Sequence, residues 1–354
     1  MALYERLAEL PVEIEGYELA PLSLDVSSDF TRDTTVIRLH GGGEQGIGED
    51  VTYDGLDHVA FQEAGATIEL AGAHTLGSLS ELLTDEALFP VPPVRAFSYN
   101  YRRWGFESAA LDLALRQTGR SLAEAVGREP RPVRFVISLR LGSPASIDPL
   151  RKRLALYPSM RFKLDPTNEW TEQLIAELAA TGAVDTLDLK SFYEGSPVDV
   201  ETDPQLYRWL LDAFPDEVWL EDADATDPET RELLAPHAAR LTWDAPLHSV
   251  ADIEGAPLGP PRMVNIKPSR FGSLRELCAV YEHCEARGIG MYGGGQFELG
   301  PGRGQIQYLA SLFHPDNPND VAPVGYHVHE IGPGLPQSPL PPAPAPTGFR
   351  WSEG

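Results

Sequence analysis

Cysteine is scarce in this sequence, and it contains neither a long apolar run nor a basic cluster. Its two cysteines, Cys278 and Cys284, lie six residues apart on one expected helix, which is not a metal or redox spacing. We therefore expect two buried, inert thiols, as suits a reducing cytoplasm. The first sixteen residues lack the apolar core of a signal peptide, and no run approaches 18 apolar residues. We expect a cytoplasmic protein without a membrane span.

Positive charge is also in short supply. The 354 residues contain 28 Lys and Arg against 53 Asp and Glu, which gives a net charge of −25. No Lys/Arg-rich stretch offsets this balance, so we expect no nucleic-acid partner. The acidic excess favours solubility or a saline habitat over a functional patch. Hydrophobic residues make up 42% of the chain, enough for a real core in one large and one smaller domain.

The N-terminal third predicts a small mixed domain. Residues 11–53 are β-rich and favour antiparallel strands, and their glycine-dense GGGEQGIGE segment predicts turns. A helix of the phosphate-binding type does not follow that segment. Residues 55–95 predict short helices that end at the Pro-rich FPVPPV. We therefore place the first domain at residues 1–95.

After a long amphipathic helix, strand and helix patterns alternate through residues 96–330. This alternation predicts a second domain built as an α/β barrel of parallel strands. The Pro-rich remainder, residues 331–354, predicts an extended tail that wraps the surface or returns to the first domain. Eight segments read as strands: 134–141, 160–165, 184–190, 217–222, 241–246, 262–268, 289–295 and, more weakly, 320–326.

Four charged residues end successive apolar runs in this barrel. Asp188, Glu221, Asp244 and Lys267 are separated by 33, 23 and 23 residues, about one strand–loop–helix–loop unit per step. The C-terminal ends of barrel strands surround one mouth, where such enzymes keep their active sites. Three acids converging there predict a site of oxygen ligands for a hard cation. The lysine beside them is a candidate acid/base.

These motifs, taken in order, resemble the enolase superfamily, nearest its muconate-lactonizing and mandelate-racemase branches. TRDTTVIRLHGGGEQGIGEDVTY resembles the hairpin of the capping domain, and RWGFESAALDLALRQTGRSLAEAVG resembles the helix that leads into the barrel. LEDAD, WDAP and NIKPSRFGSL resemble the fourth, fifth and sixth barrel strands. The resemblance covers most of the chain.

The resemblance implies a (β/α)7β TIM-type barrel with an N-terminal α+β capping domain. It implies Mg2+ held by Asp188, Glu221 and Asp244, with lysine acid/base chemistry at the ends of strands two and six. Lys267 matches the sixth-strand lysine. A divalent cation stabilises the enediolate formed when a proton α to a carboxylate is removed. The implied enzyme is a lyase, such as a dehydratase of a hydroxy or sugar acid, or an isomerase, such as a cycloisomerase or racemase.

The second strand departs from the superfamily pattern of lysine, spacer, lysine. In FKLDPT, Lys163 fits the first position and Asp165 occupies the second. Either the register slips and Lys163 is the base, or the second-strand lysine is absent and one-base chemistry by Lys267 gains. On strand three, Lys190 follows Asp188 by two residues and faces the same way. Lys190 is either a substitute acid/base or an ion-pair partner of Asp165 or Asp188, and we favour the ion pair.

Together with Asp165 and Lys190, two further residues are candidates for acid/base chemistry or substrate contacts. Glu298 resembles a late glutamate of the superfamily, and His248 follows the fifth strand closely. The expected partner is a small-molecule carboxylate, and a homo-oligomer is an open alternative because such barrels often associate. Two other functions stay open. A metal-independent Schiff-base aldolase would keep full activity in EDTA, and a catalytically silent ligand-binding barrel would exchange no substrate α-protons in D2O.

Overall fold

The computed structural model describes residues 2–26, 30–192 and 200–351. A three-stranded antiparallel sheet forms the centre of the N-terminal part, as the β-rich pattern predicted. Its strands are adjacent in chain order: β2 (Gly16–Val26), β3 (Phe30–Gly41) and β4 (Glu44–Asp50). A second antiparallel pair joins β1 (Pro11–Ile14) to β5 (Gly72–Thr75). The helices of this part are α1 (Leu3–Ala8), α2 (Gly55–Ala64), α3 (Leu76–Leu82), α4 (Asp85–Leu88), α5 (Ser98–Gln117) and α6 (Leu122–Val126).

The glycine-dense segment between β3 and β4 explains how α5 lies on the sheet. Gly42 and Gly43 have φ values of +56° and +76° and form the predicted turn. Gly46 and Gly48 lie within β4 itself. A Cβ on either glycine would approach a backbone carbonyl oxygen of α5 to 2.2 or 2.1 Å. The two glycines therefore let the long helix pack directly on the strand, a reason that turn chemistry alone did not reveal.

The C-terminal part is the predicted α/β barrel. Five parallel strands hydrogen-bond in chain order, and two more form a parallel pair. The strands are β6 (Ile137–Leu139), β7 (Phe162–Leu164), β8 (Val184–Asp188), β9 (Trp219–Glu221), β10 (Leu241–Thr242), β11 (Met263–Ile266) and β12 (Gly290–Gly293). Each lies inside one of the segments expected from the sequence.

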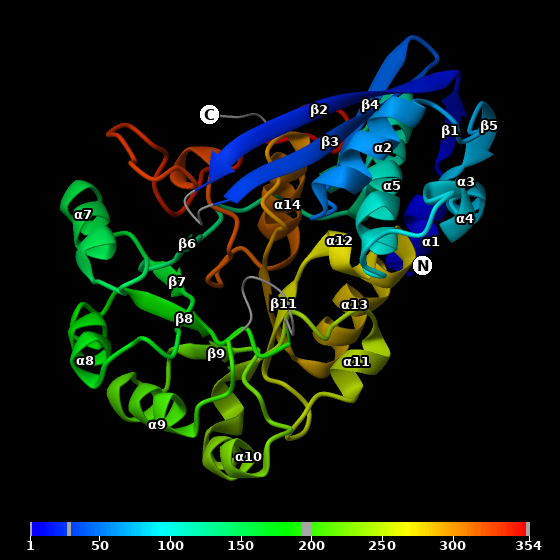
Figure 1. The fold of residues 1–354 in the computed structure, drawn as a ribbon. Coiled ribbons are helices and arrows are strands. Elements are labelled where there is room, and N and C mark those ends of the chain that lie inside the picture. Colours follow the sequence, from blue (N-terminus) through cyan, green and yellow to red (C-terminus); the bar gives the residue numbers. More distant parts are fainter. Residues whose placement is uncertain (1, 27–29, 193–199, 352–354) are drawn as a thin grey trace.

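Helices alternate with these strands, and α7 to α10 lie outside β7 to β9 (Figure 1). Their bounds are α7 (Asp148–Leu156), α8 (Glu172–Ala180), α9 (Pro204–Ala213), α10 (Pro228–Leu234), α11 (Val250–Glu254), α12 (Pro268–Phe271), α13 (Leu274–Arg287) and α14 (Pro301–Phe313). Two 3-10 helices, Ala235–Arg240 and Val324–Tyr326, complete the set for the described residues. None of the described helices is long and apolar enough to cross a bilayer.

Single backbone hydrogen bonds join the two sheets into a ring. Between β10 and β11, the Asn265 N–H donates to the Trp243 carbonyl at 3.0 Å. Between β12 and the eighth position, the Asp320 N–H donates to the Gly293 carbonyl at 2.7 Å. The strand ends of the barrel consequently surround one mouth.

The eighth strand is reduced to a bridge at Asn319, which pairs in parallel with Phe135. It begins one residue before the predicted segment 320–326, and the end of that segment is a 3-10 turn. Pro323 has no N–H to donate, which prevents a longer ladder there. The pattern therefore located the eighth position but overstated its length.

The Pro-rich tail returns to the N-terminal part, one of its two expected courses. Leu340 exchanges backbone hydrogen bonds with Val133 of the barrel at 2.8 and 2.9 Å. Further on, the Arg350 guanidinium donates to the Gln45 carbonyl at 2.6 Å and to the buried carboxylate of Asp112 at 2.8 Å. The tail thus contacts both parts of the molecule.

Candidate active site

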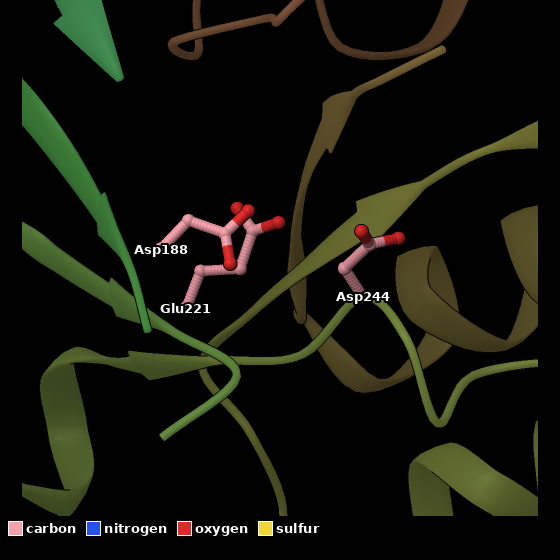
Figure 2. A group of neighbouring side chains, drawn as sticks. All are labelled: Asp188, Glu221 and Asp244. Atoms are coloured by element: carbon pink, nitrogen blue, oxygen red, sulfur yellow. The ribbon is translucent and has the colours of Figure 1, made fainter. Parts of the chain in front are cut away.

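Three carboxylates lie together at the mouth of the barrel. Asp188 ends β8, Glu221 ends β9 as its register partner, and Asp244 follows the end of β10 by two residues. All three side chains are 0% exposed, and one oxygen of each lies within 4.8 Å of the others. Figure 2 shows Asp188 and Glu221 side by side, with Asp244 coming from the neighbouring loop. The parallel strands explain this meeting of residues distant in sequence.

Lys163 is buried among these carboxylates. Its Nζ lies 2.9 Å from Asp188 Oδ2 and 2.5 Å from Glu221 Oε1, and its side chain is 1% exposed. Burial opposes its charge, but these two carboxylates raise the pKa of Lys163 well above its ordinary value. The ammonium group therefore stays charged and neutralises part of the cluster.

Lys190 contacts one of these carboxylates, Asp188, and also approaches Asp165. Its Nζ contacts Asp188 Oδ2 and lies 3.9 Å from Asp165 Oδ1. The other oxygen of Asp165 accepts a hydrogen bond from Arg140 Nε at 3.1 Å. Burial opposes the charge of Lys190, whereas Asp165 and Asp188 raise its pKa above the ordinary value. The ion pair that the sequence favoured is present, and it involves both acids.

Lys267 occupies the opposite side of the cluster. It follows β11 directly, and its Nζ lies 2.7 Å from Asp244 Oδ2. The other oxygen of Asp244 lies 3.2 Å from Arg270 Nε. Burial opposes ionisation of Asp244, but Arg270 and Lys267 lower its pKa below the usual range. Asp244 is therefore a carboxylate held between two cations.

Burial and neighbouring carboxylates nevertheless oppose the ionisation of Glu221 and Asp222. Burial raises the pKa of Glu221, Lys163 opposes that rise, and Asp188 and Asp244 add to it. Burial also raises the pKa of Asp222, with Asp244 and Asp188 adding to the effect. A divalent cation among these oxygens would relieve both shifts. One oxygen of each acid lies within 4.8 Å of the others, near the roughly 4–5 Å across an ion with oxygen ligands, so the donor set fits a hard cation.

Neighbouring side chains fix the position of Glu221, and the sequence did not single them out. Tyr292 donates its hydroxyl to Glu221 Oε2 at 2.5 Å, and Asn265 Nδ2 donates to Oε1 at 3.2 Å. Asn265 precedes Lys267 by two residues, so strand alternation was the signal that could have found it. A Cβ on Gly294 would lie 2.8 Å from Lys267 Cε, so this glycine makes room for the lysine.

Asp222 holds the loop that carries Asp244. Its backbone has a φ of +52°, and its carboxylate accepts the N–H groups of Asp244 at 2.8 Å and Ala245 at 3.0 Å. Asp222 therefore supports the position of Asp244 through the backbone of the loop.

The structure places Glu298 and His248 in hydrogen bonds of their own loops. Glu298 accepts the Gln296 N–H at 2.8 Å and lies 3.3 Å from Arg303 Nη2. The Nδ1 of His248 donates to the Pro246 carbonyl at 3.2 Å. Their contacts therefore differ from those of Lys163, Asp165, Lys190 and Lys267, which join the carboxylate cluster.

The N-terminal hairpin is anchored to the loop after β12 by buried charges that the sequence analysis missed. Glu49 is 1% exposed and accepts the N–H groups of Leu299 at 2.7 Å and Gly302 at 2.9 Å. Arg32 donates to the Gln296 carbonyl at 2.9 Å. Strand alternation cannot distinguish a charge facing solvent from one facing a second domain.

Comparison with known families divides the chain into two matched segments. Residues 5–125 match the N-terminal domain, and residues 129–328 the C-terminal domain, of a family described as Domain of unknown function (DUF8230). Together the two segments include both the hairpin and all the site residues described above.

Curated relatives are enzymes. An o-succinylbenzoate synthase of Bacillus subtilis (strain 168) is 28% identical over 228 residues, covering 62% of this chain and 58% of that protein. An N-succinylamino acid racemase of Amycolatopsis sp is 27% identical over 315 residues, covering 86% and 82%. The chain thus spans little more than half the length of the Bacillus relative.

Solved structures share the fold. A member of the enolase superfamily from Listeria innocua Clip11262 has a TM-score of 0.66 at 19% identity, covering 90% of this chain and 88% of that one. A dipeptide epimerase from Methylococcus capsulatus, complexed with a Mg ion, has a TM-score of 0.65 at 17% identity, covering 90% and 92%. Both confirm a capping domain over a TIM-type barrel.

Proposed function

Since the chain belongs to the DUF8230 family and to the enolase superfamily, we propose that it is a Mg2+-dependent enzyme that removes the proton α to a substrate carboxylate. The observation that carries the proposal is the convergence of Asp188, Glu221 and Asp244 within 4.8 Å, with Lys267 bonded to the last of them. The three acids would hold the cation. Bound there, it would supply positive charge to the substrate carboxylate as the α-proton leaves.

Lys267 is the proposed base. It would take the α-proton, and the electrons of the broken C–H bond would move toward the substrate carboxylate. Its position after β11 places it across the acids from β7 and β8. The second lysine of the site is either Lys163 or Lys190, because both contact Asp188.

We propose an acylated carboxylic acid as the substrate class. One curated relative is named for N-succinylamino acids and another for o-succinylbenzoate, and the Methylococcus structure is named for dipeptides. All three names describe a carboxylate that carries a second acyl group. The reaction is then a lyase or isomerase reaction that begins with loss of the α-proton. Two unpaired, buried cysteines further suit a cytoplasmic location.

The two alternative functions have less support. A Schiff-base aldolase needs no metal, so it gives no role to the three buried carboxylates that converge within 4.8 Å. A catalytically silent barrel gives no reason to bury three carboxylates together, because their desolvation is unfavourable.

Exchange of α-protons tests the proposed function. We expect the protein, supplied with Mg2+ in D2O, to incorporate deuterium at the α-carbon of at least one N-succinylamino acid or dipeptide. EDTA and the Lys267→Ala substitution should each reduce the exchange at least 100-fold. Undiminished exchange in EDTA would contradict the metal role. Lys152→Ala, on the exposed face of α7, is the matched control.

A further inference from the structure

Lysine is used in this protein almost nowhere except at the site. The chain has 28 basic residues, of which four are lysines and 24 are arginines. Three of the four, Lys163, Lys190 and Lys267, contact the carboxylate cluster, and the fourth is the exposed Lys152. Arginine supplies most of the other ion pairs between described residues, including the buried pair of Arg102 with Asp50. The gathering of three of the four lysines at one cluster marks these side chains as candidates for the chemistry of the site.

The strand register assigns the two candidate second lysines to different depths. Lys163 is the register partner of Thr186, two residues before Asp188 on the same strand. Lys190 lies two residues beyond Asp188, nearer the mouth. Exposure follows the same order, with 1% of the side chain exposed for Lys163 and 13% for Lys190. Lys163 therefore lies beneath the carboxylates, and Lys190 lies on the side from which a substrate enters.

The backbone is shaped to direct Lys190 back over the cluster. Its φ is +55°, a left-handed conformation that a residue with a Cβ rarely adopts. Its N–H donates to Asp188 Oδ1 at 3.3 Å, and its Nζ reaches Asp188 Oδ2. The bend thus folds the side chain inward instead of letting it extend into solvent.

Asp165 holds the far side of Lys190. It stands one residue beyond Leu164, the register partner of Leu187, and is therefore level with Asp188. Arg140 fixes one Asp165 oxygen at 3.1 Å, and the other lies 3.9 Å from Lys190 Nζ. Asp165, which occupies the position of the second-strand lysine, therefore lies beside a lysine from the end of the next strand.

We propose that Lys190 is the second catalytic lysine of the site, moved from the end of the second barrel strand to the end of the third, with Asp165 as its positioning residue. The proposal rests on the proposed function. Lys190 faces the substrate as a fixed ammonium group and stabilises the negative charge that develops when Lys267 takes the α-proton. It transfers no proton itself, and Lys163 supports the carboxylates from below.

This division of roles makes the chemistry one-sided. Lys267 takes the α-proton, exchanges it with solvent, and returns a proton or deuteron to the same face of the substrate. The configuration of the α-carbon is therefore kept during exchange. Retention distinguishes this arrangement from a two-base racemase, in which a second lysine would deliver the proton to the opposite face.

Exchange of the α-proton of N-succinyl-L-phenylalanine for deuterium, measured in D2O with Mg2+ present, tests the proposal. Lys190→Ala should lower kcat at least 100-fold and weaken equilibrium binding of this acid about tenfold, while Mg2+ affinity is unchanged or tighter. Lys190→Arg should stay within about tenfold of the unmodified protein, because arginine keeps the charge but cannot act as a base. A double variant that combines Asp165→Lys with Lys190→Asp should have a kcat for α-proton exchange at least tenfold higher than that of Lys190→Ala.

The possible failures can be told apart. Exchange within threefold of the unmodified level in Lys190→Ala would overturn the proposal and leave the proposed function standing. Racemisation as fast as exchange, or a Lys190→Arg protein as inactive as Lys190→Ala, would overturn the fixed-cation role. If the unmodified protein exchanged the α-proton of none of the N-succinylamino acids and dipeptides tested, the proposed function and this proposal would both be overturned. Thermal unfolding in Mg2+ verifies that each variant is folded.

Discussion

Replacing Lys163 by methionine removes the ammonium group that lies between two buried carboxylates. Its Nζ is 2.9 Å from Asp188 and 2.5 Å from Glu221, and all three side chains are at most 1% exposed. Methionine retains the apolar stem of the lysine, so the change is mainly one of charge. Without metal, the two buried carboxylates would then repel each other.

Removing one partner of a buried ion pair costs about 3–5 kcal/mol, because the charge left behind is not compensated. We expect about 3 kcal/mol for Lys163→Met, at the lower end, since burial already favours protonation of Glu221. Mg2+ replaces the lost positive charge. The difference from the unmodified protein should therefore fall to about 1 kcal/mol in saturating Mg2+, which requires roughly 30-fold tightening of Mg2+ binding.

Thermal unfolding in EDTA and in Mg2+, together with calorimetric titration of Mg2+, measures both quantities. For a chain of 354 residues, a loss of about 3 kcal/mol corresponds to a melting temperature roughly 4 °C lower. Lys152→Met, on an exposed position of α7, should change stability by less than about 0.5 kcal/mol under both conditions. An equal loss in EDTA and in Mg2+, or weaker Mg2+ binding by Lys163→Met, would refute the reasoning that the lysine and the cation share the same carboxylates.

Three further predictions concern stability. Glu49→Ala should lower the free energy of unfolding in urea by about 3 kcal/mol, because buried N–H groups of the loop after β12 lose their acceptor. Arg350→Ala should cost about 2–3 kcal/mol in the same assay, because Asp112 is 0% exposed and loses its cation. Burial lowers the pKa of His314 to about 4. As the pH falls below 6.5, this histidine therefore takes up a proton in the unfolded chain before it does so in the folded chain. Stability should therefore fall by about 2 kcal/mol between pH 7 and pH 5 through this histidine alone.

Each of these predictions has a matched control. Glu18→Ala removes a carboxylate that is 62% exposed and should have little effect, and equal losses at residues 18 and 49 would contradict the anchoring role. Arg131→Ala, which breaks a pair exposed by 59% and 69%, serves the same purpose for Arg350. For His314, a His314→Gln protein should lack the pH-dependent part of the loss, and an unchanged pH slope would contradict the assignment.

Spacing along the chain was enough to predict the meeting of Asp188, Glu221 and Asp244. Parallel barrel strands end at one mouth, so acids at the ends of successive apolar runs must approach one another. The seven strands were found for the same reason, because each is a short apolar run between helices. The eighth position was harder to delimit, because a bridge at Asn319 and a proline at 323 leave almost no ladder.

Contacts between elements could not be read from the sequence. The inward bend at Lys190 depends on a left-handed backbone, which no residue type at that position signals. Glu49 looks like any polar strand residue until the loop after β12 covers it. Asn265 and Tyr292 fix Glu221 from neighbouring strands, and their hydrogen bonds depend on the curvature of the closed barrel.

The location of a bound cation tests the central claim most directly. Anomalous diffraction from a crystal soaked in Mn2+ should give one strong peak bounded by oxygens of Asp188, Glu221 and Asp244, at roughly 2.0–2.5 Å from each. Lys267 and Lys190 should then lie on opposite sides of that peak. A peak elsewhere in the chain, or none at these three carboxylates at saturating Mn2+, would contradict the metal centre and the chemistry built on it.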